Sequence, residues 1–224
     1  MNQTRKSVVV NFFKFLCGLA VMGIGTYLAI QASIGVSAWD CLALGMGKRL
    51  GLSYGNSNMF ISITVIILDL VMKEKIGLGT IVNGLIFGKF VDLYTAIGFC
   101  PVVEGKLWLS AILVVVGMFF EATGVVLYMS PSLGCGPRDT FKVGLGRHVP
   151  KIKIGYVGIA INAVVLATGW LLGGPVGIGT VLEVFGYGFV ENTVNRWLKF
   201  EPRNLKHQNI VETFRVLTGK GEAA

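Results

Sequence analysis

The sequence has few charged residues and few of the groups that usually carry enzyme chemistry. Only 14% of its 224 residues are charged and 53% are hydrophobic, a balance that excludes an ordinary soluble domain. The two histidines, His148 and His207, do not have the spacing of a metal site. The four cysteines form no Cys-x-x-Cys pair, so neither a disulfide framework nor a zinc site is indicated. We therefore expect no metal and no cofactor.

Long apolar runs take the place of these features. A helix needs about 20 predominantly apolar residues to cross the bilayer core. Six runs near that length lie at 15–32, 55–72, 79–100, 107–129, 155–173 and 176–198. The sequence thus predicts an all-α, polytopic helix bundle in the cell membrane, with the lipid bilayer as a partner. The net charge of +8 gathers in loops and tails, as expected for cytoplasmic segments, so nucleic acid is not an expected partner.

The chain contains an internal repeat. The stretch SIGVSAWDCL, which begins at Ser33, has a counterpart in SLGCGPRDTF, which begins at Ser132, ninety-nine residues later. After one inserted residue the offset becomes one hundred, and a Gly-x-Gly-Thr motif then recurs. The motif residues shared by the two copies are Ser33, Gly35, Gly79 and Thr80 in the first, and Ser132, Gly134, Gly179 and Thr180 in the second. We divide the chain into repeats 1–105 and 106–200, which form one membrane domain, and a tail, 201–224.

Each repeat has a long span, a Gly-rich turn, a short segment and two more long spans. The short segments, 38–50 and 137–149, would reach only about 20 Å as helices, against a core of about 30 Å. We therefore expect a re-entrant or interfacial helix in each repeat. If the short segments do not cross, each repeat has three spans, an odd number, so the two copies have opposite orientations in the membrane. If the short segments cross fully, the alternative is eight spans in two parallel repeats.

Loop charges favour the inverted arrangement. The loop after the second span carries Lys73 and Lys75, whereas its counterpart at 173–176 is uncharged. Conversely, the first short segment carries only Lys48 and Arg49, and the loop around the second carries five basic residues. With the richer loop of each pair inside, both termini are cytoplasmic. In the tail, 206–217 has an apolar helical face that suits the inner membrane surface, and a solvated tail is an equal alternative.

The pattern S-[IL]-G, four residues, D, then G-x-G, followed later by G-x-G-T, resembles the YczE-like (YczE/YyaS/YitT) group of bacterial integral membrane proteins. The resemblance covers about residues 15–198. It implies a bacterial inner-membrane protein and brings no agreed substrate or site residues. The second copy departs from the first, because Pro137 and Arg138 stand where the first has Ala38 and Trp39.

Charged residues near or within the spans are the candidate site. Asp40 and Asp139 begin the short segments, where a carboxylate either caps the helix or takes part in coupling. Lys89 and Asp92 share a helix face, either as a structural ion pair or as the lining of a solute path. Glu121 has no obvious partner in the sequence and is the best candidate for a protonatable group. The predicted substrate-binding or coupling residues are Asp40, Lys89, Asp92, Glu121, Arg138, Asp139 and Glu183.

The sequence supports two functions of different classes. One is a small secondary transporter or permease for a small anionic or zwitterionic solute, with a polar site between the repeats. The other is a non-transporting accessory or scaffold protein of a membrane complex, in which polar residues only hold helices together. No nucleophile and base stand in credible positions, so an enzyme is not expected. The sequence leaves the oligomeric state open, a homo-oligomer included.

Overall fold

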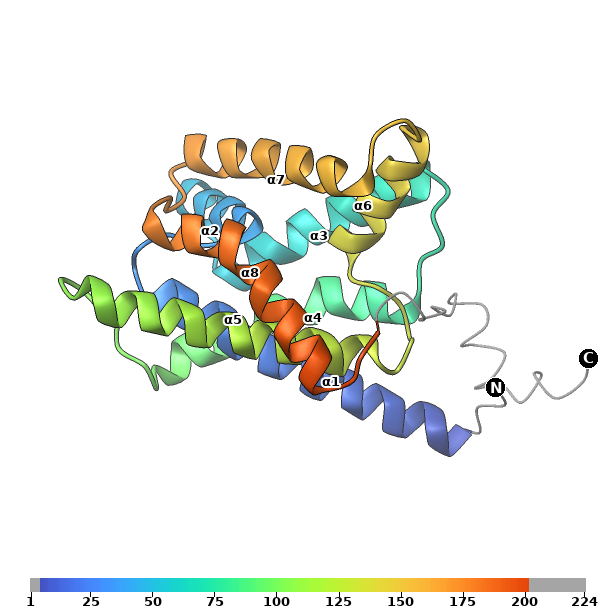
Figure 1. The fold of residues 1–224 in the computed structure, drawn as a ribbon, viewed down its shortest axis with the longest axis horizontal. Helices are drawn as coiled ribbons and strands as arrows, with labels where there is room; N and C mark the ends of the chain where they lie inside the picture. The colour runs from blue at the N-terminus through green and yellow to red at the C-terminus, as the bar shows by residue number, and fades with distance from the viewer. Residues whose placement is uncertain (1–4, 202–224) are drawn as a thin grey trace, which may run out of the picture.

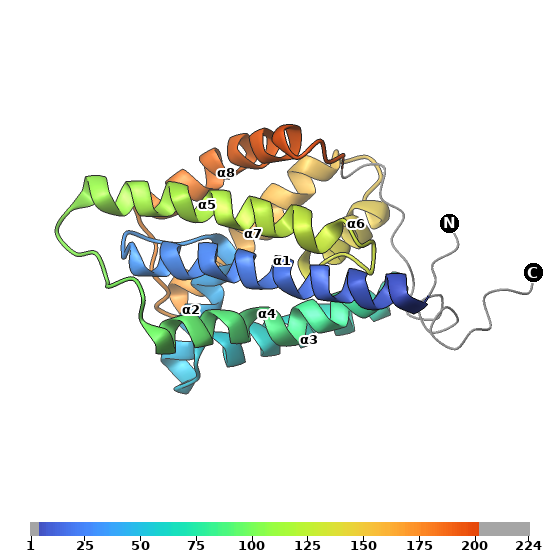
Figure 2. The same cartoon turned by 90° about the horizontal axis from the view of Figure 1, so that it is seen from below.

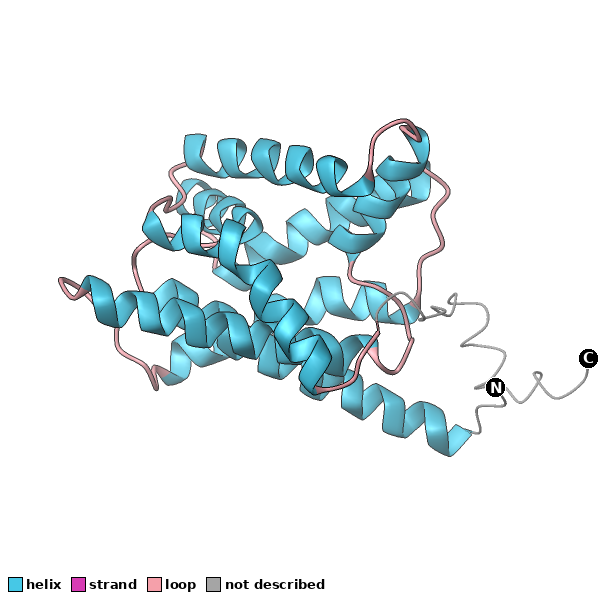
Figure 3. Ribbon diagram, in the orientation of Figure 1, coloured by secondary structure: helices cyan, strands magenta, loops and turns pink. Residues whose placement is uncertain are grey.

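The computed structural model describes residues 5–201, and this part of the chain is all-helical and contains no strand (Figures 1 and 3). Its helices are α1 Arg5–Gln31, α2 Ala38–Leu50, α3 Tyr54–Val71, α4 Leu78–Ile97, α5 Leu107–Met129, α6 Pro137–His148, α7 Ile154–Leu171 and α8 Ile178–Trp197. The predicted helical segment 206–217 lies outside the described residues. The described part fits the expected all-α bundle, with six long helices and two short ones.

Within residues 5–201, five helices are long and apolar enough to cross a membrane. They are Val9–Gln31, Tyr54–Val71, Leu78–Ile97, Leu107–Met129 and Ile154–Leu171. The remaining long helix, α8, has 20 residues like α4, but Glu183, Glu191 and Arg196 lower its hydropathy. The short helices α2 and α6 have 13 and 12 residues, too few to span the core. The protein is therefore a multi-pass membrane protein, and a span at 176–198 stays a prediction.

The first helix starts earlier than its apolar run. The sequence predicts a span from residue 15, whereas α1 begins at Arg5, ten residues before. Hydropathy detects only the apolar part of a helix. The helix itself extends into polar residues wherever the backbone hydrogen bonds from residue i to residue i−4 continue. The end of α1 and the bounds of α2 agree with the predicted segments to within one residue.

Helices α1 and α5 form the centre of the bundle and run antiparallel (Figure 2). Glycines permit their close approach: a Cβ on Gly124 would lie 2.7 Å from the carbonyl oxygen of Gly18. At the other crossing point, a Cβ on Gly117 would lie 2.8 Å from the carbonyl oxygen of Gly25. Small residues at such positions are typical of tightly packed membrane helices. Gly18 and Gly25 correspond by the sequence offset to Gly117 and Gly124, so Gly18 meets the counterpart of Gly25, and Gly25 meets the counterpart of Gly18.

The Gly-rich turns hold the copies together in a reciprocal manner. Ser33 and Ser132 have positive φ angles of 55° and 59°. In the turn that follows α1, the carbonyl oxygen of Ile34 accepts a hydrogen bond from Gly179 N at the start of α8, at 2.7 Å. In the turn that follows α5, the carbonyl oxygen of Leu133 accepts from Gly79 N at the start of α4, at 2.9 Å. Each turn therefore packs against a helix of the other copy.

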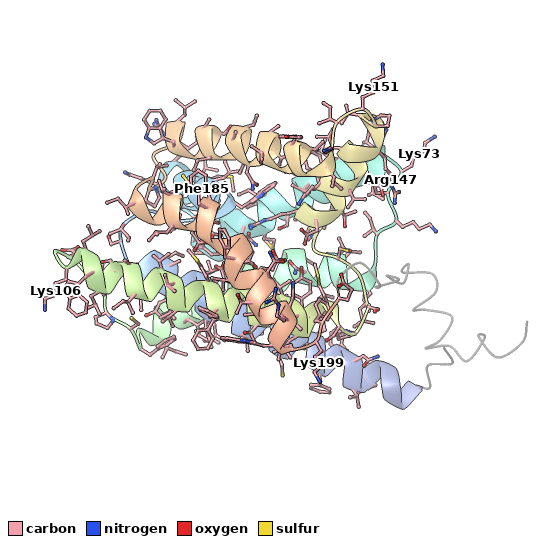
Figure 4. The ribbon with its side chains drawn as sticks, in the orientation of Figure 1. Lys73, Lys106, Arg147, Lys151, Phe185 and Lys199 are labelled. Atoms are coloured by element: carbon pink, nitrogen blue, oxygen red, sulfur yellow. The ribbon has the colours of Figure 1, made fainter. Side chains whose placement is uncertain are left out.

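The two ends of the bundle differ in the basic side chains that they carry. Lys73, Arg147 and Lys151 gather at the end where α1 begins, and Lys106 lies at the opposite end (Figure 4). Arg147 also forms an ion pair with Glu74, with Nη1 2.9 Å from Oε2. We call the end that carries Lys73 and Lys151 the basic end.

Candidate functional site

A polar cavity lies between the two copies. It has a volume of about 470 Å³, is partly open to the outside, and is lined by residues from all eight helices. Its charged lining residues are Asp40, Glu121, Arg138, Asp139, Lys142 and Glu191. Four of the predicted site residues, Asp40, Glu121, Arg138 and Asp139, thus line the same space although they lie on three different helices.

The short helix α2 places Asp40 at the cavity wall. Ser37 caps α2, and its Oγ accepts from Asp40 N at 3.4 Å while donating to Asp40 Oδ2 at 2.6 Å. Tyr54 OH donates to the other carboxylate oxygen, Oδ1, at 2.7 Å. The Asp40 residue is buried, so two hydroxyl groups replace the water that the carboxylate would otherwise bind. The capping role falls to Ser37, and the Asp40 carboxylate is held in place at the cavity.

Arg138 is fixed between two residues of the first copy. Its Nη2 donates to Oδ1 of Asn58 on α3 at 2.5 Å. Its guanidinium carbon lies 5.0 Å from the ring centre of Trp39 on α2, a cation–π contact. Trp39 is itself held by a hydrogen bond from Nε1 to Oδ1 of Asn162 on α7, at 3.2 Å. A planar guanidinium has five N–H donors, so these contacts orient the group and leave donors for a ligand.

Two further carboxylates of the lining, those of Glu121 and Asp139, lie near hydroxyl donors. Glu121 on α5 accepts from Thr26 Oγ1 on α1 at 2.8 Å, a partner that lies ninety-five residues away in the chain. On α6, Oδ2 of Asp139 accepts a hydrogen bond from Tyr128 OH at 3.4 Å. Carboxylates and a guanidinium that face one space can bind both a positive and a negative group of a solute.

Lys89 and Asp92 do not line this cavity; they join α3 to α4. Asp92 accepts from Ser53 Oγ at 2.7 Å and from Gly55 N at 2.8 Å. Lys89 Nζ donates to Asn56 Oδ1 at 2.5 Å, and its distance to Asp92 Oδ2 is 3.9 Å. The predicted ion pair therefore exists at the edge of contact distance, and the stronger bonds run to the neighbouring helix.

Glu183 is buried on α8 beside the cavity and is not part of its lining. Its charge interacts with that of Asp40, and also with that of Glu121. Among the described residues, no hydrogen-bond partner reaches its Oε1. Its counterpart in the first copy, Asn83, does line the cavity. The arrangement places a further acid behind Asp40 and Glu121, which both face the cavity.

The Gly-x-Gly-Thr motifs do not form an anion site at a helix start. Thr80 and Thr180 each accept a hydrogen bond from the first glycine of the motif, Gly77 N at 3.3 Å and Gly177 N at 3.2 Å. The backbone N–H groups of Gly79 and Gly179 donate to the Gly-rich turns, as described above. Protein groups therefore occupy the donors that an anion would need.

Sequence reasoning missed several residues that hold the charged groups of the cavity in place. Trp39, Asn58, Tyr54 and Tyr128 orient the charged groups, and each is an uncharged residue within or beside an apolar run. The one available signal is adjacency, since Trp39 directly precedes Asp40 in the turn that the repeat marks. Of the two cysteines in the repeated turns, Cys41 is buried against Gly174, and Cys135 lines a separate, smaller cavity near Lys75 and Arg147.

Comparisons with known proteins agree with a membrane protein. The profile of a family of unknown function, DUF6198, matches residues 9–196. An uncharacterised protein of Haemophilus influenzae is 31% identical over 78% of this chain and 78% of its own length. The uncharacterised membrane protein YczE of Bacillus subtilis is 25% identical over 83% of this chain and 86% of its own length. The uncharacterised protein YyaS of the same organism is 27% identical over 75% of this chain and 83% of its own. No solved structure matches the chain.

Proposed function

The chain belongs to the DUF6198 family of unknown function, and we propose on the basis of the cavity that it transports a small polar solute across the cytoplasmic membrane. The observation that carries the proposal is the convergence of Asp40, Glu121, Arg138 and Asp139 on one space between the copies. A charge inside a membrane domain costs several kcal/mol unless it is solvated or paired, and such groups usually mark a solute or ion path. A scaffold protein needs neither the cavity nor its charges.

The reciprocal contacts between the copies support an inverted-repeat transporter. Equivalent helices α1 and α5 run antiparallel and meet reciprocally, Gly18 at the counterpart of Gly25 and Gly25 at the counterpart of Gly18. Inverted repeats related in this way place the solute site between the halves, near the middle of the membrane. The basic end, which carries Lys73, Arg147 and Lys151, is then cytoplasmic by the positive-inside rule, and both termini face the cytoplasm.

The solute that fits this lining best is zwitterionic. Four carboxylates and two basic groups face the cavity, so a solute with only negative charge would add to an existing excess. Arg138 offers its remaining donors to an anionic group, while Asp40 and Glu121 attract a positive one. A small molecule with an ammonium and a carboxylate satisfies both.

Transport is tested in liposomes that contain the purified protein and a ¹³C-labelled metabolite extract from bacteria. Mass spectrometry then measures which compounds leave the liposomes faster than from protein-free ones. We expect selective loss of small zwitterionic compounds, and a decrease of about tenfold or more with Arg138→Gln or Asp40→Asn, because each removes a charge-assisted bond.

The matched control is Glu104→Gln, which removes a carboxylate from an exposed loop. This variant should retain the wild-type rate. Equal retention of every compound by wild-type and empty liposomes would refute the transport proposal, and efflux of simple dicarboxylates alone would refute the zwitterion.

A further inference from the structure

The pair α3 and α4 and the pair α7 and α8 are equivalent by the sequence repeat, yet they pack differently. Helices α3 and α4 lie side by side, whereas α7 and α8 diverge and scarcely touch, with α8 crossing towards α5 (Figure 1). The same order of helices therefore has a closed arrangement in one half and an open one in the other.

Two glycines mark the closed contact. A Cβ on Gly88 would lie 2.7 Å from the Cα of Gly55, so the backbones of α3 and α4 touch at this point. The bonds of Asp92 to Ser53 and Gly55, and of Lys89 to Asn56, surround the same point. Gly55 lies in the first turn of α3, which runs from there towards Lys73, so the contact lies away from the basic end.

The second copy retains both glycines without their contact. An offset of one hundred places Gly155 opposite Gly55 and Gly188 opposite Gly88. Among the described residues, no atom lies within 4 Å of a Cβ built on either one, beyond its immediate chain neighbours and its own helix backbone. Gly155 lines the cavity, and Gly188 stands three residues before Glu191, another lining residue, on the same helix face.

We propose that Gly155 and Gly188 meet in a second conformation, in which α7 and α8 close the cavity at the basic end as α3 and α4 close it at the other. The facing surfaces around Gly155 and Gly188 are here called the α7–α8 gate. The inference rests on the proposed transport function, since alternate opening of two gates is what a carrier requires. The present structure is the state open at the α7–α8 gate.

The sequence makes this gate the weaker of the two. The positions equivalent to Ser53, Asn56, Lys89 and Asp92 hold Lys153, Tyr156, Phe189 and Asn192. These residues cannot reproduce the same set of hydrogen bonds. Phe189 has no polar group in its side chain, and the Lys153 ammonium can only donate, whereas the Ser53 hydroxyl both donates and accepts. The closed form of the α7–α8 gate thus lacks the bonds that hold α3 to α4, and the open form is the resting state.

The gate is tested by a disulfide. Gly155→Cys and Gly188→Cys are introduced together after Cys17, Cys41, Cys100 and Cys135 are replaced by Ala or Ser, and membranes are treated with a mild oxidant. We expect an intramolecular disulfide, detected by mass spectrometry of digested protein. The matched control pairs Gly155→Cys with Phe185→Cys, which is exposed on α8, and should form none. No disulfide in the first pair, with both cysteines free to react with maleimide, would overturn the gate.

A second pair of variants separates closure from folding. Gly188→Leu enters open space in the present structure, so we expect an unchanged melting temperature, and transport reduced by about tenfold or more because the closed state is blocked. Gly88→Leu meets the backbone of α3 and should lower the melting temperature. Normal transport by Gly188→Leu would contradict the gate and leave the transport proposal standing. Formation of the disulfide in a protein that moves no solute would instead support the α7–α8 gate and contradict the transport proposal.

Discussion

The guanidinium of Arg138 lies 5.0 Å from the ring centre of Trp39, and the two residues come from short helices of different copies. They occupy the same position in the repeat, since the offset of ninety-nine places Arg138 of the second copy opposite Trp39 of the first. The departure between the copies therefore generates the contact: identical residues at both positions would give two tryptophans or two repelling cations.

This contact predicts the effects of two substitutions. Trp39→Ala removes the ring that holds Arg138 and should weaken solute binding by about 0.5–2 kcal/mol, while Trp39→Phe retains part of the attraction. Binding to the purified protein by calorimetry measures both, once efflux has identified a solute. Equal affinities for the Ala and Phe variants would mean that Trp39 does not orient Arg138.

The bonds between α3 and α4 predict unequal roles for Lys89 and Asp92. Asp92→Ala leaves Ser53 Oγ and Gly55 N without their acceptor, which should cost about 1–3 kcal/mol and lower the melting temperature. Lys89→Met removes one hydrogen bond and a half-exposed ion pair and should cost about 1 kcal/mol or less. A larger effect for Lys89→Met would contradict this order.

The Gly-rich turn predicts a strong dependence on Gly35. Its φ is 103°, and a Cβ there would lie 2.5 Å from Gly177 N, so Gly35→Ala adds both strain and a clash. Gly98 also has a positive φ of 65°, but a Cβ on it would meet only one atom, at 4.0 Å. Thermal unfolding should show a clearly larger loss for Gly35→Ala than for Gly98→Ala, which serves as the control for strain alone.

The thiol of Cys135, in the turn before α6, should react slowly with maleimides. Burial, and next the charge of Asp139, raise its pKa to about 12. At pH 8 only about one thiol in ten thousand is then the reactive thiolate, and the rate should rise about tenfold per pH unit. Asp139→Asn removes a negative charge, so it should lower the pKa and speed the reaction in detergent, with the other cysteines replaced. An unchanged rate would contradict the influence of Asp139.

The orientation of the repeats is tested by cysteines at positions 48 and 151. In inverted repeats Lys48→Cys faces the outside and Lys151→Cys the cytoplasm, so a membrane-impermeant maleimide should label only the first in intact cells. Labelling of both, or of neither, is the result expected of parallel repeats.

The sequence predicts the helices well because a helix that crosses a membrane consists of a long apolar run, which is visible in the sequence. The bounds of α2 agree with the predicted segment 38–50, and α6 ends one residue before the predicted 149. The repeat also locates the turns that meet the other copy. The predicted start of the first helix, residue 15, was too late, since α1 begins at Arg5. A helix can continue beyond the apolar stretch that crosses the bilayer core.

The partners of the charged residues were beyond the reach of sequence patterns. Spacing along one helix correctly pairs Lys89 with Asp92, but it says nothing of Ser53 and Asn56 on the neighbouring helix, which bind them more closely. Glu121 has no partner within its own helix, and Thr26 reaches it only because glycines let α1 and α5 approach. Contacts between helices depend on three-dimensional packing, and rules based on the spacing of residues along one helix do not predict them.

The reciprocal docking of the turns also bears on how the protein assembles. Gly79 N bonds to Leu133 O and Gly179 N bonds to Ile34 O, so each copy completes the backbone hydrogen bonding of the other. A single copy synthesised alone would leave these backbone groups without their partners, and an unsatisfied backbone group away from water costs several kcal/mol. Two fragments divided in the loop between α4 and α5 should consequently depend on each other for survival in the cell.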